Sequence, residues 1–278
     1  MPVKIITDSS ADLPDQLVKE LGIAVVPLYV RFGEEVYRDR VSISEDEFYQ
    51  RLENDPVHPT TVQPGPQDFV EVYQKESAGA DSIVSIHISG KLSGTCNSAL
   101  MARDMMEGGC PVEVVDTQSA SMGQGLMVMA AARMAKAGES SDKIVAEMKK
   151  AIPQIHLLAM FDSLKYLLLG GRIGKAKALL GSILNVKPII ALKDGEVVPA
   201  GQARNRARGM DKLFDFVKNA AGIQDLAIVY NTMPDEAQDM AERISSVFDK
   251  KKITMARVGP TLGVHLGPGM LIVVFRGK

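Results

Sequence analysis

The stretch HISGKLSGTCNSA, residues 87–99, joins an apolar run to a segment with the composition of a helix. Two glycines and three hydroxyl residues, Ser89, Ser93 and Thr95, crowd the turn between them. A strand, a glycine-rich turn and a helix start in succession are typical of α/β proteins, in which free amides at the helix start hold a small anion. The stretch therefore predicts an α/β fold and suggests a site for phosphate or carboxylate.

This turn lacks the signatures of a nucleotide-binding loop. The pattern GxxxxGK[ST] is absent, because Lys91 precedes the turn instead of opening the helix, and GxGxxG is absent as well. What remains is Ser93, Gly94 and Thr95 at a helix start, with backbone amides and hydroxyl groups as donors. Taken alone, the turn slightly favours a capped helix start that holds no ligand.

The composition sets limits on the class of protein. The 278 residues are 46% hydrophobic and 24% charged, which is enough to bury the core of one large or two ordinary domains. A net charge of -2 argues against nucleic acid as a partner. No apolar run reaches the ~18–20 residues that span a bilayer, and the strand-like start MPVKIITDSS carries no signal peptide pattern, so we expect a cytoplasmic protein. Two cysteines and four scattered histidines predict no metal site, and we expect no cofactor.

Strand-like runs alternate with helical segments through the first half of the chain. This order predicts a mostly parallel sheet with flanking helices over residues 1–153. Residues 23–32 form one predicted strand, and residues 58–69 a proline-rich loop. The organisation changes after that, because Asp194-Gly195 marks a hairpin. Residues 154–278 are therefore a predicted α+β domain with a mixed or antiparallel sheet. With no low-complexity linker, we expect the two domains to pack closely around a cleft that holds the ligand.

Three further turns at predicted strand ends carry polar residues. Residues 7–14, TDSSADLP, are explained most simply as a helix cap. In the second turn, prolines stiffen the loop that presents Thr61. The third, residues 258–270, surrounds His265 with four glycines and two prolines. His265 is the best placed of the four histidines: His87 and His156 lie in strand-like runs typical of a protein core, and His58 lies in a polar, solvated loop.

Serine and histidine together also suggest a Ser–His hydrolase or transferase. This hypothesis is weak, because no GxSxG elbow is present and no acidic residue flanks His265 to orient its imidazole. Hydroxyl groups and a histidine around glycine-rich turns fit equally well as donors that bind an anion without attacking it. The residues alone leave both possibilities open.

Taken together, these motifs resemble the DegV family from end to end. IITDSSADLP, at residues 5–14, is similar to the N-terminal signature of the family, and HISGKLSGTCNSA to its serine loop. The block LKYLLLGGRIGKAKALLGSILNVKPII, residues 164–190, and the histidine loop GPTLGVHLGPG, residues 259–269, complete the resemblance. Members of this family bind a long-chain fatty acid. Some are the lipid-carrying subunit of bacterial fatty acid kinase, in which a separate ATP-binding subunit phosphorylates the acyl carboxylate for phospholipid synthesis.

The resemblance implies particular roles for residues of this chain. The carboxylate ligands fall on Thr61, Ser93 and His265, supported by the amides of Gly94 and Thr95. Two hydroxyls and an imidazole suit the lone pairs of a carboxylate. The basic positions, expected to face the kinase subunit or the transferred phosphoryl group, are Arg172, Arg204 and Arg206. One departure from the family pattern is that Val62 and Gly65 replace two serines, which puts in doubt any ligand contact beyond Thr61 in that loop.

The acyl tail would need a long apolar tunnel. At ~0.8 kcal/mol per buried CH₂, a sixteen-carbon chain gains roughly 10 kcal/mol, so the tail should dominate affinity while the polar residues set its register. Candidate walls are the residues Met101, Met105, Met122, Met127, Met129, Met160 and Phe161. We therefore expect a protein that binds a fatty acid and presents it to a kinase subunit, with brief contact with a membrane surface. A Ser–His acyl hydrolase or transferase and a carrier of another amphipathic anion are the alternatives.

Overall fold

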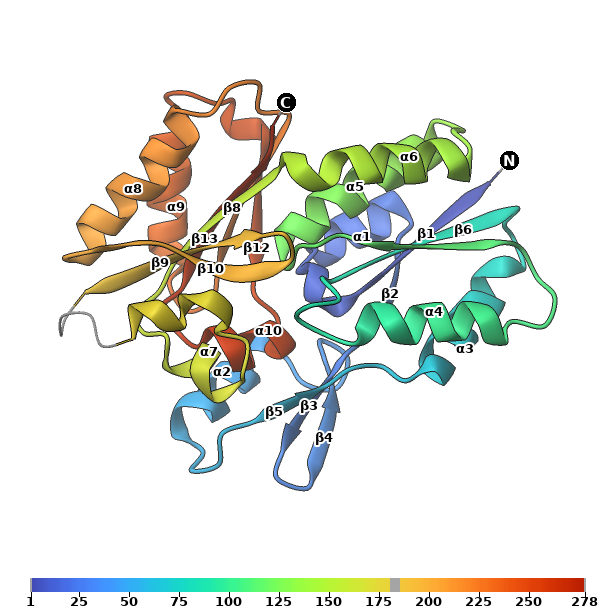
Figure 1. Ribbon diagram of the computed structural model, residues 1–278, viewed down its shortest axis with the longest axis horizontal. Helices are drawn as coiled ribbons and strands as arrows, with labels where there is room; N and C mark the ends of the chain where they lie inside the picture. The colour runs from blue at the N-terminus through green and yellow to red at the C-terminus, as the bar shows by residue number, and fades with distance from the viewer. Residues whose placement is uncertain (1, 181–185, 278) are drawn as a thin grey trace.

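The computed structural model describes residues 2–180 and 186–277, and Figure 1 shows two large sheets side by side with a small sheet below them. The first sheet is fully parallel, in the order β2-β1-β6-β7, as predicted. All six residues of β6 are buried, which is typical of a parallel strand covered on both faces. Its strands are β1 (Val3–Asp8), β2 (Ala24–Val26), β6 (Ser82–His87) and β7 (Val112–Asp116).

Helices cover both faces of this first sheet. One face packs against α3 and α4, and the other packs against α5 with α1 and α6 beside it. α5 also contacts β11 (Asp225–Tyr230) and β13 (Leu271–Arg276) of the second sheet, so it lies between the two sheets. Ten residues of α5 from Gly123 to Ala132 are buried in succession, which this central position explains. The helices are α1 (Asp15–Leu21), α3 (Pro66–Ser77), α4 (Thr95–Met105), α5 (Met122–Lys136) and α6 (Ser141–Ala151).

The second sheet is mixed, as predicted, in the order β10-β9-β8-β13-β11-β12. Among its pairs, β11 and β12 are parallel and the others antiparallel. The turn between β9 and β10 holds Asp194 and Gly195 at positive φ, so the predicted hairpin is confirmed. Helices α8 (Arg206–Lys218) and α9 (Pro234–Ile244) pack on one face. The strands are β8 (Ile155–Met160), β9 (Lys187–Lys193), β10 (Glu196–Ala203), β11 (Asp225–Tyr230), β12 (Ile253–Arg257) and β13 (Leu271–Arg276).

A small antiparallel sheet, β4-β3-β5, was not predicted. The single strand expected over residues 23–32 divides, because Pro27 has no amide hydrogen to continue the first sheet. β2 ends before it, and β3 (Tyr29–Phe32) begins a different sheet with β4 (Glu35–Arg38) and β5 (Thr60–Val62). Thr61 therefore lies in a strand and not in a loop, since it pairs with Val30. Helix α2 (Glu45–Asn54) packs nearby, and the hydroxyl of the preceding Ser44 caps its first turn by accepting from the amide of Glu47.

The glycine-rich segment 258–270 is also not the loop we expected. Residues Pro260–Leu266 form the short helix α10, with Pro260 in the first turn and Gly267 at positive φ after the last. The long helical block after residue 163 is likewise reduced to α7 (Lys165–Leu169) and a 3-10 helix, Gly174–Leu179. The end of the second predicted helix, residues 181–185, lies outside the described residues. Other 3-10 turns are Ser9–Ala11, Ile152–Gln154 and Lys250–Lys252.

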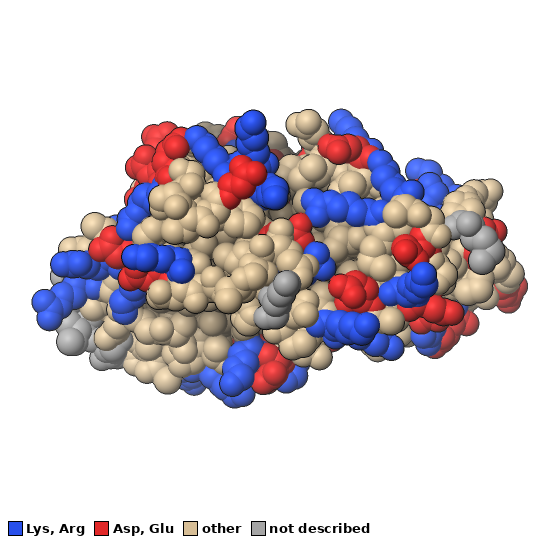
Figure 2. All heavy atoms as spheres, turned by 90° about the horizontal axis from the view of Figure 1, so that it is seen from above, with Lys and Arg blue, Asp and Glu red and all other residues tan. Residues whose placement is uncertain are grey.

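The change from the first sheet to the second falls between β7 and β8, with α5 and α6 in the interval. The boundary at residues 153 and 154 stays a prediction. Figure 2 shows Lys, Arg, Asp and Glu interspersed over the face in view, with no broad region of one sign. Within residues 2–180 and 186–277, no helix is long and apolar enough to cross a membrane, and no group of three or more His, Cys, Asp or Glu could hold a metal ion.

Candidate functional site

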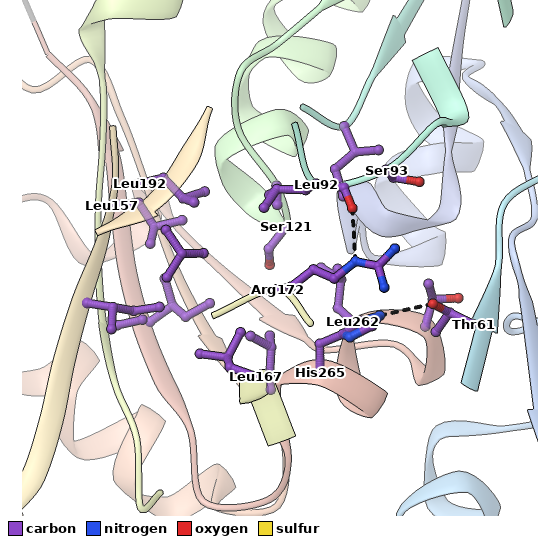
Figure 3. A pocket seen from close by; sticks show the side chains of 18 of the residues that line it. Thr61, Leu92, Ser93, Ser121, Leu157, Leu167, Arg172, Leu192, Leu262 and His265 are labelled. Atoms are coloured by element: carbon purple, nitrogen blue, oxygen red, sulfur yellow. Dashed lines mark hydrogen bonds between the residues drawn. The ribbon is translucent and has the colours of Figure 1, made fainter. Parts of the chain in front are cut away.

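A cavity of about 730 Å³, including its open mouth, lies between the two large sheets and α10. Its walls are mainly aliphatic, and they come from both halves of the chain (Figure 3). β8 and β9 contribute alternate residues, which is why one face of each strand lines the cavity. The apolar lining is Leu28, Ile88, Leu92, Ala120, Leu157, Ala159, Phe161, Leu167, Ile190, Leu192, Val197, Leu262, Leu266 and Ile272.

Polar side chains from three separate segments meet at one end of this cavity. Thr61 comes from β5, Ser93 from the turn before α4, and His265 from the last turn of α10. Thr61 Oγ1 and His265 Nε2 lie 2.9 Å apart and share a hydrogen bond. Ser93 Oγ shares a hydrogen bond of 2.8 Å with the hydroxyl of Thr95. The structure therefore brings together the three residues that the resemblance indicated as carboxylate ligands.

His265 is held neutral by its surroundings. Burial, the nearby Arg172 cation and His58 together lower the pKa of its imidazole to about 4. Its Nδ1 atom is buried and has no hydrogen-bond partner among the described residues. The backbone of Gly170 faces that atom closely, since a Cβ at Gly170 would lie 2.0 Å from Nδ1. The ring is thus confined on one side by Gly170 and bonded on the other to Thr61.

Arg172 also lies at the polar end of the cavity. Its Nε donates to the carbonyl of Leu92 at 3.2 Å and its Nη1 to the carbonyl of Gly170 at 2.8 Å. Figure 3 shows the guanidinium extending toward the space between Ser93 and Thr61. The Arg172 side chain is exposed, so the polar end of the cavity lies near solvent. A cation beside three donors gives this end the chemistry of an anion site.

The two supporting turn residues, Gly94 and Thr95, pack within the turn, and the expected contact of their amides with a ligand stays a prediction. Thr95 is fully buried, bonds to Ser93 and does not line the cavity. A Cβ at Gly94 would lie 2.2 Å from Oε1 of Gln63, so this glycine makes room for the Gln63 side chain and not for a ligand. Gln63 in turn donates to Ser98 in α4. The turn thus holds Ser93 through its own packing.

The other two predicted arginines lie away from the cavity. Arg206 forms ion pairs with Glu236 and Asp162 and donates to the carbonyl of Gly269, so it fastens α8 to α9 and to the segment before β13. Arg204 is exposed at the end of β10 and does not line the cavity. Their expected contact with a partner subunit stays a prediction.

The walls of the cavity differ from those we predicted. Met101 and Met105 are exposed on α4, and the buried methionines pack in the cores, so among the candidate wall residues Phe161 lines the cavity. A helical stripe of methionines was the wrong signal. Residues 157–161 and 190–192 are instead uninterrupted apolar runs in or beside strands, and every second residue of each run lines the cavity because successive side chains of a strand point to opposite faces. Ser121 and Thr261 also line the cavity, and no sequence signal identified them.

The hydrolase hypothesis finds no support in this site. A Ser–His–Asp chain does exist, but elsewhere: Ser85 Oγ is 2.6 Å from His87 Nε2, and His87 Nδ1 is 2.9 Å from Asp8 Oδ2. All three side chains are fully buried, so no substrate reaches them. His87 is a satisfied core histidine, as expected, and Asp8 caps the 3-10 turn that follows it. At His265, no carboxylate of the described residues orients the ring.

The other two histidines correct our expectations. His156 is exposed near the start of β8 and packs against Phe275, whereas Met160, further along the same face of the strand, is buried beneath α8. His58 is half-buried against the ring of Tyr166 rather than solvated. Neither lines the cavity.

Fold and site together define an α/β protein with an apolar cavity between its two large sheets and polar side chains at one end of that cavity. A family model described as "uncharacterised protein, DegV family" matches residues 2–278. The chain therefore belongs to the DegV family.

Three relatives illustrate the similarity. A DegV domain-containing protein of Caldanaerobacter subterraneus is 34% identical over 99% of each chain. The structure of a DegV family protein from Thermus thermophilus, described by its fatty acid binding, is 34% identical, with a TM-score of 0.93 and 100% of each chain covered. A stearic acid-binding protein from Eubacterium ventriosum is 27% identical, with a TM-score of 0.89 over 99% of this chain and 98% of that one.

Proposed function

We propose that this protein binds a long-chain fatty acid and presents it to a separate ATP-dependent kinase subunit, which forms the acyl phosphate used in phospholipid synthesis. One observation carries the binding proposal: Thr61, Ser93 and His265 meet at one end of an otherwise apolar cavity. Relatives of the same fold that bind a fatty acid, including stearic acid, support it.

The polar end suits a carboxylate on chemical grounds. The hydroxyls of Thr61 and Ser93 can each donate a hydrogen bond, and Arg172 adds positive charge beside them. The neutral imidazole of His265, when its Nε2 carries the proton, can share that N–H between Thr61 Oγ1 and the carboxylate. Hydrogen bonds to a charged acceptor are stronger than neutral ones, at ~1.5–3 kcal/mol each. The aliphatic walls favour a saturated or singly unsaturated hydrocarbon tail, whose burial contributes most of the affinity.

The presenting role follows from where the carboxylate would lie. The exposed Arg172 marks this end as the one that a partner can approach. This chain carries no nucleotide-binding pattern of the Walker type, so in the proposal the phosphoryl group arrives on another protein. Because the kinase subunit consumes ATP, the proposal includes a cytoplasmic location. Exposed Leu168 and Leu169, beside Lys165 on α7, suit brief contact with a membrane surface during loading.

Native mass spectrometry and lipid extraction of the purified protein test the binding proposal. We expect a co-purified acyl chain, and roughly tenfold weaker palmitate binding in Ser93→Ala and in His265→Ala, because each removes one donor to a charged group. Ser245→Ala and His156→Ala, both at exposed positions away from the cavity, serve as matched controls and should bind normally. A wild-type protein that carries no lipid and does not bind palmitate would refute the proposal.

The kinase step needs its own experiment. Lipid-loaded protein is mixed with a bacterial ATP-binding kinase subunit and ATP, and acyl phosphate is trapped with hydroxylamine. We expect product when both proteins are present, and none when this protein is omitted. Turnover of acyl esters by this chain alone, or an acylated Ser93, would instead favour the hydrolase alternative.

A further inference from the structure

A buried acidic residue lies behind the polar end of the cavity. Asp12, in the turn between β1 and α1, is 1% exposed and adopts a positive φ of 51°. Its Oδ1 accepts a hydrogen bond of 2.8 Å from the amide of Gly259, the residue at the start of α10. Its Oδ2 accepts one of 2.6 Å from Ser121 Oγ, at the start of α5. One carboxylate thus joins the first half of the chain to the helix that carries His265.

Arg40 reinforces the same junction. It follows β4, and its guanidinium donates to the carbonyl of Leu13 at 2.9 Å and to that of Arg257 at 2.5 Å. Its Nη2 also lies 3.5 Å from Asp12 Oδ1. The planar fork of an arginine can hold several acceptors in fixed directions, which a lysine cannot do. The segment on both sides of Asp12 and the segment that leads into α10 are therefore fixed to one another.

α10 itself is short and carries much of the site. In its seven residues, Thr261, Leu262, His265 and Leu266 all line the cavity. Its start is further held by Tyr49, whose hydroxyl donates to the carbonyl of Val258 at 3.3 Å. Because a helix this short moves as one piece, a displacement at Gly259 shifts His265 away from Thr61. The 2.9 Å bond between these two side chains depends on where α10 begins.

We propose that Asp12, held by Arg40, is a positioning residue that places His265 for contact with the ligand carboxylate. This inference rests on the proposed fatty acid binding. Asp12 does not line the cavity and touches no ligand atom; it acts through the start of α10. The effect should therefore fall on recognition of the carboxylate and leave burial of the tail nearly unchanged.

The test compares two ligands of equal chain length, dodecanoate and 1-dodecanol, by isothermal titration calorimetry. In Asp12→Ala we expect roughly tenfold weaker binding of dodecanoate and less than a twofold change for dodecanol. Asp12→Asn, which keeps the shape and one acceptor, should lie between wild type and Asp12→Ala. Asp15→Asn, at an exposed carboxylate three residues further on, is the matched control and should leave both affinities unchanged.

A second readout separates failure of this inference from failure of the proposed function. In the ligand-free protein, the imidazole ¹⁵N resonances of His265 should shift in Asp12→Ala, because its bond to Thr61 is disturbed. Unchanged His265 resonances would overturn the positioning role even if wild type binds no fatty acid. If wild type does bind, equal weakening of dodecanoate and dodecanol binding would overturn it as well. If thermal unfolding shows that Asp12→Ala does not fold, the same two measurements are made on Arg40→Lys. We expect the same pattern there, because one ammonium cannot hold both carbonyls.

Discussion

The imidazole of His265 has one hydrogen bond within the described protein, to Thr61, and its other nitrogen is buried against Gly170. A pKa of about 4 keeps this ring neutral at physiological pH. A bound carboxylate would place a negative charge beside the ring and raise that pKa, because an opposite charge favours the protonated form. Binding of a carboxylate here would therefore be coupled to proton uptake at His265, and the neutral ring could share its Nε2–H between Thr61 and the ligand without carrying a fixed charge.

The same residue predicts how stability depends on pH. The pKa of His265 is about 4 in the folded protein against the ordinary value of 6.5, so between about pH 6.5 and pH 4 the unfolded chain binds a proton that the folded one does not. Between pH 7 and pH 5 the free energy of unfolding should fall by about 2 kcal/mol from this group alone. Urea unfolding of ligand-free wild type and His265→Gln at both pH values measures it. Equal losses in the two proteins would contradict the assignment.

At the residue scale, the motifs predicted which side chains lie together but not the packing roles of the residues next to them. Ser93, Thr61 and His265 lie far apart in sequence, and it is the resemblance to the DegV family that grouped them. The reason for a glycine at position 94 is one example, because a Cβ there would collide with the side chain of Gln63. Gln63 comes from a segment some thirty residues away, and the local sequence around Gly94 contains no information about that contact, so this role could not be predicted.

At the scale of elements, the long periodic helices and buried strands were predictable and the short elements around the site were not. α10 begins at Pro260 directly after Gly259 and holds Gly263 within its seven residues, a composition typical of loops. Gly263 is required there because Phe48 lies against it, a contact with a distant helix. β5 has three residues and exists because β3 offers it a partner. Tertiary pairing, which a local pattern does not contain, decides both elements.

The packing of α7 against α10 gives a prediction at this scale. A Cβ at Gly170 would lie 2.0 Å from His265 Nδ1, so Gly170→Ala must displace either the ring or the end of α7. We expect a loss of about 1–3 kcal/mol in unfolding free energy, as for other overpacked sites, together with weaker palmitate binding.

Gly79→Ala is the matched control for this substitution, because nothing lies within 4 Å of the added methyl group. Denaturant unfolding and calorimetry of both variants provide the comparison. Normal stability and normal palmitate affinity in Gly170→Ala would show that the ring is not confined as the structure indicates.

At the scale of the whole molecule, the cavity belongs to neither half alone. One continuous core contains Val84 and Ile86 of the first sheet, Met127 of α5, and Ile190 and Ile272 of the second sheet. The sequence predicted both sheets and a ligand between them, because alternation of strands and helices and a hairpin turn are local signals. It did not predict the third sheet, whose strand β5 delivers Thr61. The position of Thr61 in the site thus depends on pairing between segments some thirty residues apart.

The shape of this shared cavity leads to a prediction about chain length. Each methylene that enters the aliphatic part should add ~0.8 kcal/mol, which is about a fourfold gain in affinity per carbon. Calorimetry with saturated fatty acids of ten to twenty carbons should therefore show a steep rise. The rise should stop abruptly where the tail reaches the walls formed by β8, β9 and β13, because tightly packed side chains there cannot yield without strain.

The position of that limit can be moved to test the walls themselves. Ile190→Ala removes bulk from β9 inside the cavity and should extend the rise to longer chains. Leu226→Ala, at a buried position on β11 outside the cavity, destabilises the fold by a comparable amount without enlarging the cavity and should leave the limit unchanged. Affinity that is independent of chain length, or an equal shift in both variants, would mean that the tail binds elsewhere than between the two sheets.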